Sequence, residues 1–122
     1  MLKMKLNDYQ NKAKQYAKYS TSDYPFLALC EEAGEVAGKL AKYVRKNNCS
    51  ASEAVEEANQ NVDKVAVEFK VGLKKELGDI LWQLQACCNE LGINLDEVAQ
   101  DNLNKLSDRN DRGVIIGEGD NR

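Results

Sequence analysis

Apolar residues recur at three- and four-residue steps along most of this chain of 122 residues, and no other feature limits the fold as strongly. The pattern is clearest from Phe26 to Lys46, where it includes Leu29, Val36 and Leu40. The spacing matches the period of an α-helix, about 3.6 residues per turn, so these side chains share one helix face. It therefore predicts an all-α fold, which we expect to be a bundle of four to five helices.

Local start and stop signals set the expected helix boundaries. Ser50 and Glu53 form a capping-box pattern before the third helix, and Gly92 stands where a glycine commonly ends a helix. Pro25 follows a break after the first helix, and Gly72 is expected to interrupt the helical pattern before the fourth helix. The expected helices cover residues 7–19, 26–46, 51–58 or 51–68, 73–91 and 94–108, with an irregular tail from 110 to 122.

Composition and charge narrow the class of protein. The chain is 43% hydrophobic and 30% charged, with a formal net charge of −3, and one domain over residues 1–122 is expected. Its slight acidity disfavours nucleic acid as the main partner, because phosphates are bound by basic surfaces. No apolar run is long enough for a transmembrane helix, and a charge comes too early for a signal peptide. We therefore expect a soluble, cytoplasmic protein that does not bind membranes.

The residue types that are missing limit the chemistry. There is no histidine, which excludes histidine bases, histidine-activated nucleophiles and zinc sites that contain histidine. The four cysteines, Cys30, Cys49, Cys87 and Cys88, include no CxxC pair, and we expect reduced thiols that act as small apolar residues. Catalysis would then depend on carboxylates, lysine, arginine, tyrosine or a metal ion.

Five carboxylates stand at helical spacing on the two most apolar predicted helices. Glu31, Glu32 and Glu35 share an arc of about 100° beside the apolar stripe of one helix, and Glu76 and Asp79 flank the stripe of the other. If these helices pack antiparallel through their stripes, the carboxylates converge. Like charges so close are unfavourable unless cations neutralise them, and Mg²⁺ prefers oxygen ligands. Each motif alone is typical of a solvated helix face, but together they favour a metal site.

The same residues resemble the signature of a known family. The segment EEAGE at residues 31–35, followed by ELGD at residues 76–79, resembles the EExxE…ExxD signature of the MazG-like, all-α nucleoside triphosphate pyrophosphohydrolases. Residues 102–109 are similar to the family's N-x-x-K-x-x-x-R segment, and residues 112–113 and 117–122 resemble the endings of small phage and bacterial members. One departure is the spacer, residues 36–75, which is longer than the usual spacer of the family.

This resemblance implies Mg²⁺-dependent cleavage of a nucleoside triphosphate to a nucleoside monophosphate and pyrophosphate, with Mn²⁺ as a possible substitute ion. By position, the implied metal ligands are Glu32, Glu35, Glu76 and Asp79. Glu31 would be a further ligand or a base that orients water, so Glu31 and Glu35 are the implied catalytic residues. The implied substrate-binding residues are Lys39, Trp82, Asn102, Lys105 and Arg109. The resemblance also implies a homodimer or homotetramer with sites between subunits, in a bacterial cell or a phage-infected host.

Some of these roles have structural alternatives. Trp82 could stack on a nucleobase or make an oligomer contact, and Lys39 could reach phosphate or balance local charge. Lys105 and Arg109 could complement the dipole of their helix. Three tyrosines, Tyr16, Tyr19 and Tyr24, could line a base pocket or belong to a core or interface.

The function itself also has alternatives. One is a non-catalytic helical module that only oligomerises, and another is a related pyrophosphohydrolase restricted to dUTP or phosphoribosyl-ATP. The clustered acids favour an enzyme, because a scaffold has no reason to gather acids near its core. The family resemblance favours action on deoxynucleotide pools, and the preferred base is left open.

Overall fold

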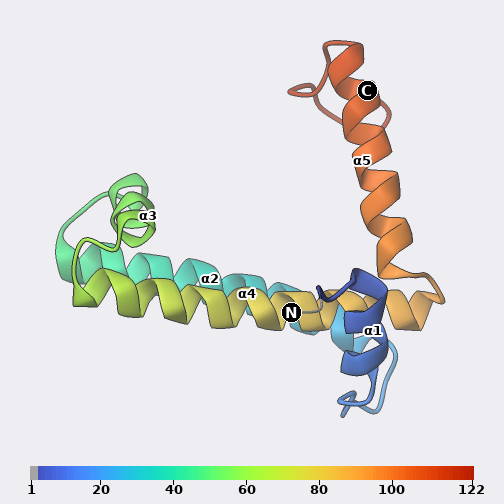
Figure 1. Ribbon diagram of the computed structural model, residues 1–122, viewed down its shortest axis with the longest axis horizontal. Helices are drawn as coiled ribbons and strands as arrows, with labels where there is room; N and C mark the ends of the chain where they lie inside the picture. The colour runs from blue at the N-terminus through green and yellow to red at the C-terminus, as the bar shows by residue number, and fades with distance from the viewer. Residues whose placement is uncertain (1–2) are drawn as a thin grey trace. The chain divides into compact units, whose positions relative to one another are not determined.

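The computed structural model describes residues 3–122 and contains five helices (Figure 1). No strand occurs among these residues, and the predicted all-α fold is confirmed. Two compact units make up the chain, one of Lys18–Cys87 and the other of the N-terminal residues to Ala17 together with Cys88–Arg122. The helices are α1 (Leu6–Lys14), α2 (Tyr24–Asn47), α3 (Ala51–Gln60), α4 (Lys64–Leu91) and α5 (Leu95–Asp111).

Within the unit of Lys18–Cys87, α2 and α4 lie side by side and run antiparallel (Figure 1). Two contacts show the direction. Lys39 pairs with Glu76, whereas Tyr43, one turn later on α2, stacks on Phe69, which lies earlier on α4. The two most apolar helices therefore pack antiparallel, which is the condition under which their carboxylates converge.

The long spacer, residues 36–75, contains the second half of α2, all of α3 and the first turns of α4. The expected extension of the third helix to residue 68 is wrong, because Asn61 takes a left-handed conformation (φ 50°) that ends α3. Asp63 then caps the next helix, with its Oδ1 accepting a hydrogen bond of 2.8 Å from the Ala66 amide. Asparagine tolerates positive φ better than most residues. The break between α3 and α4 is therefore determined by the local residues Asn61 and Asp63.

The expected interruption at Gly72 is also wrong, since α4 runs unbroken from Lys64 to Leu91. A glycine inside a helix costs about 1 kcal/mol relative to alanine, a penalty that packing against a neighbouring helix can offset. Gly72 faces α2, and a Cβ built on it would lie 3.7 Å from Cδ of Lys39. Gly92, in contrast, has φ 67° and ends α4 as predicted.

Tyr43 joins all three helices of this unit. Its ring stacks on Phe69 of α4 with 4.3 Å between the ring centroids, and its hydroxyl donates a hydrogen bond of 2.6 Å to Glu57 of α3. Ala54 and Ala58 of α3 and Ala66 of α4 are buried, and their small side chains let the helices approach closely. Helix α3 is therefore packed against the end of the α2–α4 pair.

Tyr43 gives this unit a predictable response to alkaline pH. The hydrogen bond to Glu57, with burial and the negative charge of Glu57, raises the pKa of Tyr43 from 10.0 to about 12. The neutral phenol thus stabilises the folded state fully below pH 10, and this stabilisation is lost as the pH rises to about 12. We expect the difference in melting temperature between the wild type and Tyr43→Phe to shrink across that interval. A difference that is constant from pH 8 to 12 would contradict this role.

In the other unit, α1 packs near the junction of α4 and α5 through one buried glutamine. Gln10 donates through Nε2 to Asn89 Oδ1 (2.9 Å) and to the Ile93 carbonyl (3.0 Å), and its Oε1 accepts from the Leu95 amide (2.7 Å). The helix ends at Lys14 rather than at the expected residue 19, because the amides of Tyr16 and Ala17 bond three residues back. Both of these side chains are exposed, so no burial extends the helix.

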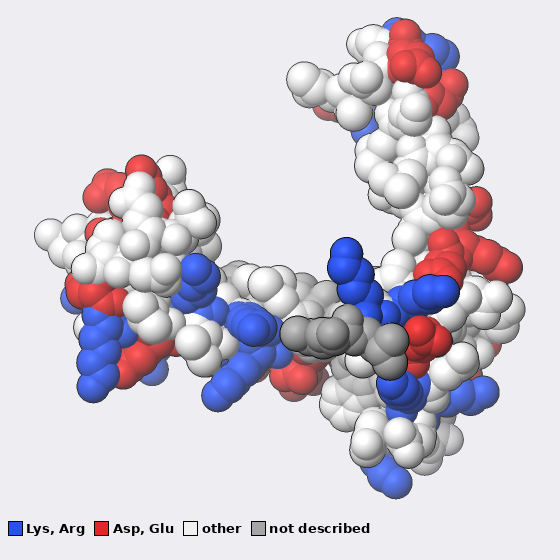
Figure 2. Space-filling view, in the orientation of Figure 1, with Lys and Arg blue, Asp and Glu red and all other residues white. Residues whose placement is uncertain are grey.

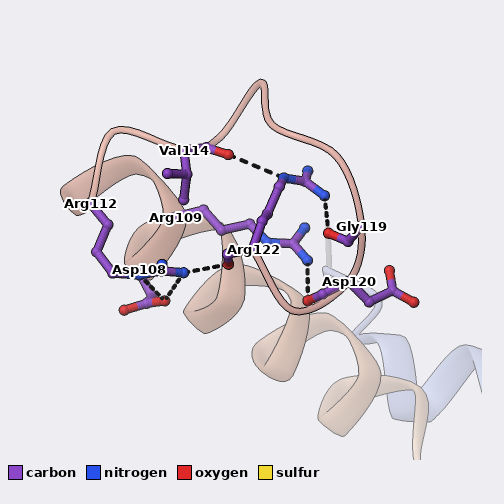
Figure 3. Close-up of polar contacts among 7 residues, drawn as sticks. All are labelled: Asp108, Arg109, Arg112, Val114, Gly119, Asp120 and Arg122. Carbon is purple, nitrogen blue, oxygen red and sulfur yellow. Dashed lines mark hydrogen bonds and ion pairs between the residues drawn. The ribbon is translucent and has the colours of Figure 1, made fainter.

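The C-terminal residues form the expected irregular tail, although α5 continues to Asp111 rather than 108. Three arginines hold the tail (Figure 3). Arg109 donates to the Asp120 carbonyl at 2.8 Å, Arg112 donates to the Arg122 carbonyl, and Arg122 donates to the Val114 and Gly119 carbonyls. The tail is thus a loop folded back on the end of α5.

Candidate metal centre

Three carboxylates from two helices meet on the α2–α4 pair. Glu32 comes from the middle of α2, and Glu76 and Asp79, three residues apart, come from α4. Each contributes one oxygen atom, and the three atoms lie within 4.8 Å of one another. Glu32 and Glu76 are half-buried, as expected for acids at the margin of an apolar stripe. The antiparallel packing of α2 and α4 is what brings these distant positions together.

The donor set fits a hard divalent cation. Mg²⁺ binds oxygen at about 2.0–2.1 Å, so ligand atoms on opposite sides of the ion are about 4.2 Å apart. A separation within 4.8 Å needs only a small side-chain adjustment to reach such a geometry. Glu32, Glu76 and Asp79 could thus hold one ion and leave positions open for water and phosphate.

The electrostatics of Glu32 show the cost of gathering these acids. Burial raises the pKa of Glu32 above its ordinary value of 4.5, and the charges of Asp79 and Glu76 add to the effect. Glu31 and Glu35 act in the same direction. All five sequence-predicted carboxylates therefore interact electrostatically at Glu32, and a bound cation would relieve their repulsion.

Lys39 partly balances this negative charge. Its Nζ lies 3.6 Å from Oε1 of Glu76, and its side chain is 41% exposed. The ion pair places Lys39 next to the acid cluster, as expected from its position one turn after Glu35. A lysine–carboxylate pair of this exposure contributes little to stability.

Glu31 and Glu35 are on the same helix but outside the group of three. Both are exposed, and Glu35 lies three residues after Glu32, on the neighbouring turn of α2. Their roles as metal ligand or base stay predictions.

Comparison with known proteins agrees with this geometry. The family model of the MazG nucleotide pyrophosphohydrolase domain matches residues 21–114, which include all five carboxylates. The chain belongs to this family. The "Gene 37 protein" of Mycobacterium phage L5 is 38% identical over 99 residues, which cover 81% of this chain and 75% of that protein. No solved structure matches the chain.

The MazG domain match also spans the predicted substrate-binding residues of α5, which belong to the other compact unit. Asn102 and Lys105 are exposed on α5. Arg109 is 5% exposed, and its guanidinium is bonded to the tail at Asp120. The structure therefore gives Arg109 a local role in holding the tail, and its contact with substrate stays a prediction.

The aromatic candidates include Trp82 and Tyr24, which lie within the residues matched by the MazG model, and Tyr16 and Tyr19, which precede them. Trp82 is half-buried on α4, three residues after Asp79. Tyr19 and Tyr24 stack on each other with 5.9 Å between ring centroids, and Tyr16 is 58% exposed. The Tyr19–Tyr24 pair supports a packing role for these two tyrosines, while a role in base binding is untested.

The cysteines are free thiols in the structure. Cys87 and Cys88 are buried, Cys49 is half-buried and Cys30 is exposed. Burial raises the pKa of the Cys88 thiol, which keeps it neutral. Among residues 3–122, the one group of acids or cysteines that could hold a metal contains no cysteine.

The sequence interpretation did not select two lysines of α2 as candidate site residues. Lys42 and Lys46 lie near the C-terminal end of α2, where cations complement the helix dipole. In the structure they also line a groove together with Lys39. The signal that could have found them is their spacing. Positions 39, 42 and 46 fall on one face of a helix.

Proposed function

We propose that this MazG-family protein is a Mg²⁺-dependent pyrophosphohydrolase that converts a nucleoside triphosphate to a nucleoside monophosphate and pyrophosphate. The observation that carries the proposal is the convergence of Glu32, Glu76 and Asp79, within a domain of the nucleotide pyrophosphohydrolase family. A group of acids on facing helices is suited to a metal ion that binds phosphate.

The five carboxylates divide into metal ligands and a base in this proposal. Glu32, Glu76 and Asp79 would hold Mg²⁺, or Mn²⁺ in its place, and Glu35 would complete the ligands from the next turn of α2. The bound ion would supply positive charge that offsets the charge of the phosphate oxygens. Glu31 would accept a proton from the water that cleaves the α–β anhydride bond, so no histidine is needed.

Three residues of α5 and one of α4 are the proposed substrate-binding residues. Lys105 and Arg109 would donate hydrogen bonds to phosphate oxygens, and Asn102 would do so as a neutral donor. Arg109 would have to exchange its bond to the Asp120 carbonyl for a bond to substrate. Trp82 would stack on the nucleobase.

We also propose that the protein is a homodimer or homotetramer. Several apolar side chains of the α2–α4 unit are exposed, among them Leu27 at 68% and Leu77 at 56%, and a second subunit would cover them. No helix among the residues that the structure describes could span a membrane. The phage relative supports action in a bacterial or phage-infected cell. We propose that the protein acts there on nucleotide pools that include deoxynucleotides.

The reaction products test the proposal directly. Purified protein with Mg²⁺ should convert at least one of the eight common NTPs and dNTPs to the monophosphate and intact pyrophosphate, as measured by chromatography. A diphosphate with orthophosphate would show that the cleavage position is wrong. If neither these nucleotides nor phosphoribosyl-ATP were turned over in the presence of any divalent metal, the non-catalytic oligomerisation module would be favoured.

Lys105→Ala is expected to lower kcat/KM about tenfold or more, because a charge-assisted hydrogen bond to phosphate is lost. The melting temperature should change little, since Lys105 is exposed. Lys12→Ala on α1 removes another exposed lysine and is the control. An equal loss in both variants would assign the effect to net charge rather than to a phosphate contact.

A further inference from the structure

A groove of about 290 Å³ lies between α2 and α4. Its lining includes three lysines of α2, which are Lys39, Lys42 and Lys46, together with Phe69 of α4. All of these residues belong to the unit of Lys18–Cys87. Figure 2 shows Lys and Arg side chains along the α2–α4 pair, with Asp and Glu side chains on α3 and also on the pair.

The lysines of the groove are spaced like a row of phosphate contacts. Positions 39, 42 and 46 are about 4.5 and 6 Å apart along the helix axis and share one face. Glu68 is the one acid among the lining residues, and its Oε1 lies 3.9 Å from Nζ of Lys64, outside the groove. The groove therefore carries net positive charge in a protein whose overall charge is −3.

Lys39 connects the groove to the metal centre. It lines the groove and also pairs with Glu76, one of the three converging carboxylates. A cation bound to Glu76 would compete with Lys39 for that carboxylate and free the ammonium group for an anion in the groove. Phosphate held at the metal centre would thus lie beside a row of cations.

The polar groups in the wall of the groove do not suit a nucleobase. The Tyr43 hydroxyl is occupied by Glu57, and the Asn47 side-chain amide donates to the Tyr43 carbonyl. Three of the lining residues carry ammonium groups, those of Lys42 and Lys46 and that of Lys39, which pairs with Glu76. This chemistry matches a small anion with several oxygen atoms rather than a base with a specific pattern of donors and acceptors.

We propose that this groove binds a pyrophosphoryl group, either as free pyrophosphate or as the terminal phosphates of a triphosphate. The inference rests on the proposed function and deepens it, because the same group is the expected leaving group. Lys42 and Lys46 hold the anion, and Lys39 passes between Glu76 and the anion. Pyrophosphate that stays in the groove slows the next turnover and makes the enzyme sensitive to its own product.

Calorimetric titration with pyrophosphate in EDTA tests the groove without the metal centre, since an acid cluster without a cation repels anions. We expect the wild type to bind, and Lys42→Ala/Lys46→Ala to lower the affinity about tenfold or more. Arg45→Ala/Lys70→Ala is the matched control, because it removes two cations from the same helices outside the groove lining. Glu68→Gln should tighten binding a few-fold. Circular dichroism checks that each variant is folded.

Several results would overturn the inference. They are the absence of pyrophosphate binding by the wild type, equal losses in the lysine pair and its control, and binding of a nucleoside monophosphate as tightly as pyrophosphate. A nonhydrolysable α,β-methylene triphosphate distinguishes the two sources of the group. Lysine-dependent binding of this analogue supports the terminal phosphates as occupant, and binding of pyrophosphate alone supports the free product.

Turnover assays on the same samples separate this inference from the proposed function. Lysine-dependent binding of pyrophosphate without turnover of any nucleotide would refute the proposed function and leave the groove as an anion site. Turnover with product inhibition that Lys42→Ala/Lys46→Ala leaves unchanged would refute the groove and leave the proposed function intact.

Discussion

Asp79→Asn is expected to lower kcat/KM for a nucleoside triphosphate at least about a thousandfold, a loss of about 4 kcal/mol in transition-state stabilisation. Asp79 contributes one of three converging oxygen atoms, and a neutral amide is a much weaker ligand for Mg²⁺. Pyrophosphate release at saturating Mg²⁺ measures the loss. Asp101→Asn, the same change at an exposed position of α5, is the control and should keep wild-type activity.

Thermal melts separate a lost ligand from a damaged fold. Without a divalent cation, Asp79→Asn should melt at or above the temperature of the wild type, because the substitution removes repulsion at Glu32. Added Mg²⁺ should raise the melting temperature of the wild type more than that of the variant. Full activity together with an equal Mg²⁺ shift in Asp79→Asn would remove this residue from the metal site.

Glu35→Gln tests one of the two predicted carboxylates that lie outside the group of three. If Glu35 completes the ligand set when Mg²⁺ binds, the variant should lose both activity and most of the Mg²⁺-dependent rise in melting temperature. Loss of activity with an unchanged Mg²⁺-dependent rise in melting temperature would instead assign Glu35 the role of a base that orients the attacking water. Wild-type behaviour in both assays would exclude either role.

Gln10→Ala is expected to lower the free energy of unfolding by about 2–4 kcal/mol, the largest effect on stability that we expect from one substitution. The side chain is 5% exposed and makes three hydrogen bonds, to Asn89, Ile93 and Leu95. Truncation leaves these partners without the glutamine in a largely buried place. Urea denaturation followed by circular dichroism measures the change, with the exposed Asn11→Ala on the same helix as control. A loss below about 0.5 kcal/mol would show that water replaces the glutamine at little cost.

Local sequence was sufficient for most of the helical framework. The apolar periodicity from residue 26 to 46 anticipated α2, and the Ser50 capping box anticipated the start of α3, where the Ser50 hydroxyl accepts from the Glu53 amide. Gly92 ended α4 as predicted. These features depend on residues within about one helical turn of each other, so they can be read from neighbouring positions.

The composition of the candidate metal centre was largely predictable for the same reason. The spacing of Glu76 and Asp79 places both carboxylates on one side of a helix before any tertiary contact exists. Glu32 likewise follows from its position beside the apolar stripe of α2. Their convergence required only that the two most apolar helices pack against each other in an antiparallel manner.

The continuity of α4 and the side-chain contacts between distant segments were decided by tertiary structure alone. The continuity of α4 through Gly72, the ion pair of Lys39 with Glu76, and the three bonds of Gln10 depend on the register and rotation of packed helices. The apolar pattern fixes which face of a helix is buried but leaves those two quantities open, since several registers bury similar apolar area. Sequence therefore determined the helices and the acids that they carry, and packing determined which acids meet and which cations lie beside them.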